Sequence, residues 1–163
     1  MRAPVFVSLL LALTTVVPGN RAVIAQSESH SAEELLVGTW VLDVPASRYL
    51  PGPPPRGEIR SYARGAQGVN GIIKRTHADG HVETIEYLAN SDQEHMVTGT
   101  PEYDAVKLRQ IDPFTSEALL THGGAIFGSA TRIIGRDGKT MRIIFRRPDA
   151  DVLNVAVYRK QEK

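Results

Sequence analysis

Residues 69–89 read VNGIIKRTHADGHVETIEYLA and contain the signal that decides the fold. The dipeptide Asp79-Gly80 separates two runs rich in β-branched residues, 69–78 and 81–89. Asp-Gly is a strong hairpin signal because both central residues of such a turn tolerate a positive φ. The stretch therefore predicts two antiparallel strands joined by a tight turn.

Turn signals recur on both sides of this hairpin about every 8 to 12 residues, a spacing typical of all-β sandwiches and barrels. The predicted strands are 39–44, 58–64, 69–78, 81–89, 94–98, 105–111, 116–122, 125–135, 140–147 and 152–160. About ten antiparallel strands normally close or fold over to remove their edges. The alternative to a barrel is a Greek-key sandwich, but most connections here are too short for one. We therefore expect an all-β, antiparallel up-and-down barrel of about 8–10 strands.

Two further segments adjoin the first predicted strand. Ser31, with Glu34 three residues later, forms the pattern of a capping box and predicts a short N-terminal helical turn. Residues 50–56 contain four prolines and a glycine. Proline cannot donate to a strand ladder, so this segment should run as an extended loop over the surface or the barrel mouth. Farther along, Gly128 beside Phe127 indicates a bulge or a close approach of strands.

The first 25 residues form a separate segment. Arg2 precedes an apolar run at 4–17, and small residues stand before Gln26. This is the pattern of a secretory signal peptide cleaved before Gln26, and the run is shorter than the roughly 18 residues that span a membrane. An uncleaved anchor is the alternative. We expect residues 1–25 to be a signal peptide, residues 26–163 to be one barrel domain, and the mature protein to be periplasmic or secreted from a bacterium, with no membrane span.

Composition narrows the functional classes. The 163 residues are 42% hydrophobic and 23% charged, as in one globular domain. Removing Arg2 and Arg21 from 19 basic residues leaves 17 against 18 acidic ones, a formal charge of −1. Without a dense basic block, nucleic-acid binding is disfavoured. The sequence contains no cysteine, which excludes thiol chemistry and a lipoprotein anchored through a cysteine. No recognised catalytic motif is present either. The sequence predicts no cofactor.

Three stretches resemble a known family. Residues 36–42, LVGTWVL, look like the first strand of the calycin superfamily, which includes lipocalins and fatty-acid-binding proteins. Residues 155–160, VAVYRK, are similar to the closing strand of fatty-acid-binding proteins. The run 38–55 resembles exported bacterial lipocalin-like proteins of uncharacterised function. The resemblance implies a lipocalin-like barrel.

The resemblance also bears on individual residues. In fatty-acid-binding proteins an arginine two positions before the closing tyrosine holds the ligand carboxylate, but that position is Ala156 before Tyr158, so this clamp does not carry over. Their helical lid is replaced by the proline-rich segment. In lipocalins an arginine near the end of the barrel stacks on the opening tryptophan, which implies a structural contact between Arg159 and Trp40.

Histidines are the first candidates for chemistry. His77 and His81 flank the Asp79-Gly80 turn and should lie at one rim of the barrel, where two imidazoles can shuttle protons or bind a metal. Two histidines without a positioned third ligand are a weak metal signal, and histidines beside an exposed turn are usually solvated. His95 and His122 would join them only in a suitable register. We therefore predict no metal site.

Glu86 is the second candidate. Alternation places it on one face of its strand, while Glu83 and Tyr87 share the other face. If Glu86 faced the interior, burial would require a paired arginine. The arginines that could pair with it are Arg75, Arg109 and Arg132. The alternative, which the pattern favours, is a row of cross-strand ion pairs on the outside.

A barrel of this size encloses room for one small molecule. We expect an exported barrel that binds a small, mostly apolar ligand. The candidate contacts are Tyr62, Tyr87, Arg109, Phe127, Arg132 and Tyr158. The alternative is a cofactor-independent isomerase, lyase or hydratase with His77, His81 or Glu86 as its general acid or base. A third hypothesis is an envelope interaction module whose barrel is filled by its own side chains.

Overall fold

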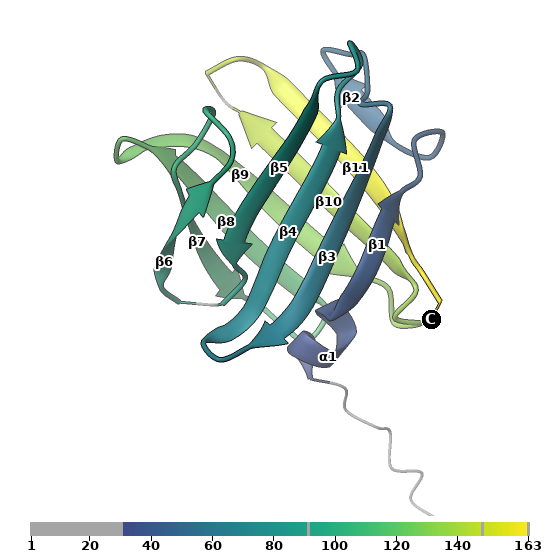
Figure 1. Cartoon of the computed structure of the whole chain (residues 1–163), viewed down its shortest axis with the longest axis vertical. Helices are drawn as coiled ribbons and strands as arrows, with labels where there is room; N and C mark the ends of the chain where they lie inside the picture. The colour runs from purple at the N-terminus through teal and green to yellow at the C-terminus, as the bar shows by residue number, and fades with distance from the viewer. Residues whose placement is uncertain (1–30, 91, 148, 163) are drawn as a thin grey trace, which may run out of the picture.

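The alternating segments form strands that wrap into a closed antiparallel barrel, as the computed structural model shows for residues 31–162 apart from 91 and 148 (Figure 1). One short helix, α1 (Ala32–Leu36), precedes the strands. The strands are β1 (Gly38–Leu42), β2 (Arg48–Leu50), β3 (Gly57–Gly65), β4 (Gly68–Thr76), β5 (Val82–Leu88), β6 (Glu94–Thr98), β7 (Ala105–Gln110), β8 (Thr115–His122), β9 (Ala125–Ile134), β10 (Thr140–Arg147) and β11 (Val152–Lys160).

From β3 to β11, strands that are consecutive along the chain pair with each other. β1 pairs with both β3 and β11 and so closes the sheet. β2 pairs with the other half of β11: Tyr49 lies opposite Asn154, whereas Trp40 of β1 lies opposite Lys160. β1 and β2 thus share one position, and ten strand positions surround the barrel. The predicted up-and-down barrel with a short helical turn is confirmed. The sandwich does not form, and β2 is the one strand of the described residues that the sequence did not predict.

One end of the barrel is closed by α1. Ser31 and Glu34 form the predicted capping box. The buried Leu35 and Leu36 lie against the barrel base, where the indole Nε1 of Trp40 donates a hydrogen bond of 2.8 Å to the Leu36 carbonyl. Trp40 is completely buried. The helix therefore seals this end through both apolar packing and a directed hydrogen bond.

The cation above Trp40 is not the predicted one. Lys160 places its Nζ 5.0 Å from the centre of the indole ring and donates to the Leu35 carbonyl. Arg159 points outward and contacts Asp43 at 3.3 Å. The expected contact between Arg159 and Trp40 is wrong because alternation along β11 turns Arg159 away from the interior, while the register sets Lys160 opposite the tryptophan.

The other end is where β4, β6, β8 and β10 finish, and it carries β2 and the proline-rich segment (Figure 1). Gly99 follows β6 here with φ +85°, and a Cβ at this position would lie 1.8 Å from the Thr84 carbonyl oxygen. Only glycine lets the chain turn so close to β5. This close approach fixes the rim between β5 and β7.

The predicted signal peptide lies outside the described residues, so its cleavage stays a prediction. Within residues 31–162, leaving aside 91 and 148, no helix has the length and apolar character needed to cross a membrane.

Candidate functional site: a cavity inside the barrel

The barrel encloses a cavity of about 590 Å³ between the sealed base and the opposite end. Its deep walls are apolar. They include Ile73, Val97, Val106, Leu108, Ala118, Leu120, Ala130 and Ile143. Pro51, Pro53 and Pro55 contribute to the lining near the mouth, as the proline content of that segment predicted. The volume falls within the roughly 300–1,000 Å³ typical of small-molecule sites.

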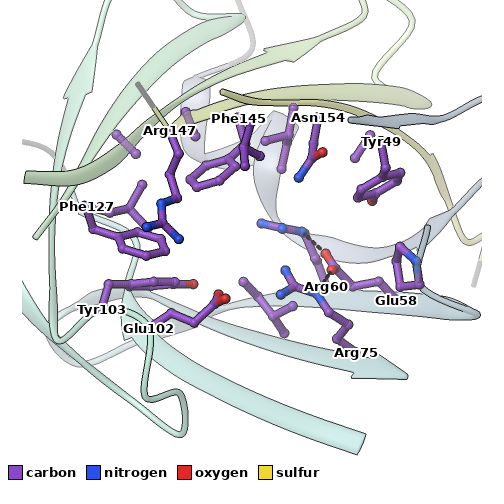
Figure 2. Close-up of a pocket in the computed structure, with 18 of the residues that line it drawn as sticks. Tyr49, Glu58, Arg60, Arg75, Glu102, Tyr103, Phe127, Phe145, Arg147 and Asn154 are labelled. Carbon is purple, nitrogen blue, oxygen red and sulfur yellow. Dashed lines mark hydrogen bonds and ion pairs between the residues drawn. The ribbon is translucent and has the colours of Figure 1, made fainter. Parts of the chain in front are cut away.

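An aromatic group forms one side of the cavity. Phe127 lies 5.6 Å from Tyr103 and 6.1 Å from Phe145, measured between ring centres, and the Arg147 guanidinium lies 4.5 Å from the Phe127 ring (Figure 2). A bulge explains the position of Phe127: Leu120 pairs with Gly128 while Thr121 pairs with Ile126, which leaves Phe127 without a partner. Bulges re-aim side chains in this way, and the sequence had indicated one here.

The opposite side carries a buried ionic network (Figure 2). Glu58 is 3% exposed, and its Oε1 accepts hydrogen bonds of 2.6 Å from the Nε of Arg60 and the hydroxyl of Tyr158. Its Oε2 accepts a bond of 2.6 Å from the Nε of Arg75. Both carboxylate oxygens are therefore satisfied by charged or strong donors, the condition for burying a charge.

Electrostatics keep this carboxylate ionised. Burial raises the pKa of Glu58, but Arg60, Arg75 and the hydrogen bond from Tyr158 outweigh it and lower the pKa to about 2. Burial raises the pKa of the neighbouring Tyr49 to about 12. At neutral pH Glu58 is thus a fixed anion with little basicity, and Tyr49 is a neutral phenol that can donate a hydrogen bond.

The network continues to the rim. A terminal nitrogen of Arg75 lies 3.5 Å from Glu83, and Glu83 lies 3.3 Å from the Nε2 of His77. The rings of His77 and His81 are 5.6 Å apart beside the β4–β5 turn. The sequence correctly put both histidines at one rim, and Glu83 contacts His77 there.

Two tyrosines lie at the bottom of the cavity. Tyr62 and Tyr87 stand on either side of Gly71 in adjacent strands, and their hydroxyls are 3.2 Å apart. A Cβ on Gly71 would lie 3.0 Å from the Tyr87 ring, so the missing side chain lets the two rings meet across β4. Burial raises the pKa of Tyr62, but Arg60 and Arg132 outweigh it and lower that pKa, whereas burial and Tyr62 raise the pKa of Tyr87.

The structure places some of the predicted ligand contacts in the cavity wall and others beneath it. Tyr87, Phe127 and Tyr158 line the cavity. Tyr62 is 3% exposed and lies beneath it, with Arg132 5.8 Å from the centre of its ring.

Other predicted site residues lie away from the cavity. Arg109 is on the outer face, bonded to Glu117 at 2.6 Å. Glu86 is also exposed, as the outside alternative required, but its cross-strand neighbours are Ile72 and Thr98 rather than partners of opposite charge. His95 and His122 do not line the cavity. Among the described residues no group of three or more His, Cys, Asp or Glu side chains is placed so that it could hold a metal ion.

The most polar part of the site was not predicted. Glu58 and Arg60 were absent from the candidates, and Arg75 was considered only as a partner of Glu86. The available signal was the two-residue period that puts Glu58 and Arg60 on the same face as Tyr62, which was a candidate.

Fold and site together define a ten-position antiparallel β-barrel that is sealed at one end by a helix and contains a cavity with one aromatic and one ionic side. No protein family, curated protein or solved structure matches the chain, so the functional argument rests on this geometry.

Proposed function

We propose that the protein binds a small, mostly apolar organic molecule inside the barrel, and that it does so as an exported lipocalin-like protein. The observation that carries the proposal is the cavity of about 590 Å³, which the chain's own side chains leave open although the base beneath it is tightly filled. Native interiors are otherwise packed nearly as densely as organic crystals. A barrel serving only as an interaction module would need no such space.

The ionic network favours binding over catalysis by a carboxylate base. A general base at neutral pH works best with a pKa near 7. Glu58, the carboxylate buried in the cavity wall, has its pKa lowered to about 2 by the two arginines, and Glu86 faces solvent. The polar side is thus arranged to hold fixed charges, which orients a ligand.

A neutral fluorescent probe tests the proposal. N-phenyl-1-naphthylamine should bind the folded protein with enhanced emission. Ala130→Phe places a phenyl ring on the cavity wall and should weaken binding at least about tenfold, because an apolar contact of ring size is displaced. The matched control is Ser129→Phe, one residue away on the outward face of β9, which should bind like the parent protein.

Absence of probe binding, or equal affinity of Ala130→Phe and the parent, would overturn the proposal. Native mass spectrometry of protein purified from its own cells adds the identity of the molecule, since a retained ligand appears as added mass.

A further inference from the structure

The ionic side of the cavity holds its arginines in a particular orientation. Glu58 is bonded to the Nε of both Arg60 and Arg75, so the terminal nitrogens of each guanidinium extend beyond the carboxylate. Figure 2 shows both guanidinium groups directed toward the middle of the cavity. The Arg60 side chain is 12% exposed and lies 5.1 Å from the centre of the Tyr158 ring, which limits its movement. Terminal nitrogens of both arginines therefore face the space where a ligand would lie, although one of those of Arg75 is 3.5 Å from Glu83.

The charges on this side are unevenly balanced. Glu58 is shared by two arginines, and the second carboxylate, Glu83, contacts Arg75 rather than Arg60. Asp79 and Glu102 also line the cavity, but they are exposed at its mouth, where water screens them. Of the two arginines on this side, Arg60 therefore has the less compensated charge and the less exposed side chain.

Asn154 supplies a neutral donor and lines the same cavity as Arg60. The side-chain oxygen of Asn154 accepts a hydrogen bond of 3.2 Å from the Leu50 backbone N–H. Because that bond requires the oxygen, the amide nitrogen must occupy the other position. Figure 2 shows the Asn154 side chain directed into the cavity. An acidic group that reaches both Asn154 and Arg60 would receive hydrogen bonds from both residues.

We propose that the ligand is an organic anion. Its apolar body packs against the aromatic side chains around Phe127, and its single acidic group is bound by the terminal nitrogens of Arg60 and the amide nitrogen of Asn154. The proposal rests on the proposed function and specifies its ligand class. Arginine forks match the planar or tetrahedral oxygens of carboxylates and sulfonates, and such charge-assisted bonds are about twice as strong as neutral ones. The anchor lies on β3, not at the closing-strand position occupied by Ala156.

A matched pair of probes tests the inference. N-phenyl-1-naphthylamine and 1-anilinonaphthalene-8-sulfonate share one aromatic framework and differ by a sulfonate. The parent protein should bind the sulfonate at least about tenfold more tightly, as one strong charge-assisted bond predicts. Arg60→Gln should remove that preference while changing affinity for the neutral probe less than about threefold. Arg109→Gln, on the outer face, should bind both probes like the parent.

A second variant covers loss of folding in Arg60→Gln. Asn154→Asp keeps an oxygen for Leu50 and puts a negative charge beside the anion, so it should weaken sulfonate binding at least about tenfold and leave the neutral probe nearly unaffected. If the neutral probe binds but the sulfonate is not preferred, or if Asn154→Asp binds both like the parent, the anion inference fails and the proposed function stands. If neither probe binds, both fail.

Discussion

Replacing Glu58 by glutamine should lower stability and flatten its dependence on pH. The substitution keeps the size of the side chain but removes the carboxylate that Arg60 and Arg75 share. An amide oxygen can accept from one guanidinium, but the amide nitrogen then faces the other. Removing one member of a buried ionic group generally costs about 3–5 kcal/mol because the remaining charge is left without compensation.

The pKa gives a second, independent magnitude. The pKa of Glu58 falls from its ordinary 4.5 to about 2, a difference worth about 3 kcal/mol at about 1.36 kcal/mol per pH unit. Because the folded state binds the proton less readily than the unfolded state, this stability is fully present above about pH 5 and is lost as the pH falls toward 2. About 2 kcal/mol of it should be gone at pH 3.

Urea unfolding at pH 7 and pH 3 measures both effects, with the single, fully buried Trp40 as the fluorescent reporter. Glu58→Gln should be about 3–5 kcal/mol less stable at pH 7 and should lose about 2 kcal/mol less than the parent between pH 7 and pH 3. Exposed aspartates whose pKa values are lowered by hydrogen bonds contribute equally to both proteins.

The control is Glu117→Gln, which breaks an ion pair of the same 2.6 Å length between side chains that are 68% and 47% exposed. Exposed pairs are worth about 0–1 kcal/mol, so this variant should unfold almost like the parent. If Glu58→Gln costs less than about 1 kcal/mol and keeps the parent's pH dependence, the reasoning on the buried network is refuted.

Three further predictions concern the rim, the base and the N-terminus. Gly99→Ala should cost more than about 2 kcal/mol, because of its positive φ and a carbonyl oxygen within 1.8 Å, while Gly123→Ala, with open space around it, should cost about 1 kcal/mol in the same thermal denaturation. Lys160→Ala should shift the tryptophan emission and cost about 1–2 kcal/mol, whereas Arg159→Ala should do neither; the reverse result would restore the original expectation. Protein exported by a bacterial host should have the intact mass of a chain starting at Gln26, and a mass that retains residues 1–25 would contradict the predicted cleavage.

The fold could be predicted because its signals are local. Asp79-Gly80, the capping box of Ser31 and Glu34, and the regular turns each act within a few residues, and neighbouring antiparallel strands follow from them. The error at Arg159 had a different origin. It depended on the register between β1 and β11, which joins the two ends of the chain and sets Lys160 rather than Arg159 opposite Trp40.

The site could not be predicted because β3 inverts the usual pattern. Ile59 is 42% exposed, while Glu58 and Arg60 point into the barrel. A polarity rule alone would turn this strand the other way. Its true orientation depends on Arg75 from β4 and Tyr158 from β11, because the bonds from these two residues make the burial of Glu58 tolerable. Tyr158 is separated from Glu58 by 100 residues. Within β3 the signal for the true orientation is Tyr62, which shares the face of Glu58 and Arg60.

This inversion itself supports a ligand. Replacing a buried ionic group by apolar side chains of similar volume is often neutral or stabilising, so the requirements of folding do not explain why Glu58, Arg60 and Arg75 occupy the wall. Apolar packing around Trp40 fills the base below the cavity. Charges held beside an open apolar space become most favourable when an anion exchanges its water shell for oriented donors. Glu58, Arg60 and Arg75, whose burial the hydrophobic pattern does not predict, therefore mark where binding energy is available.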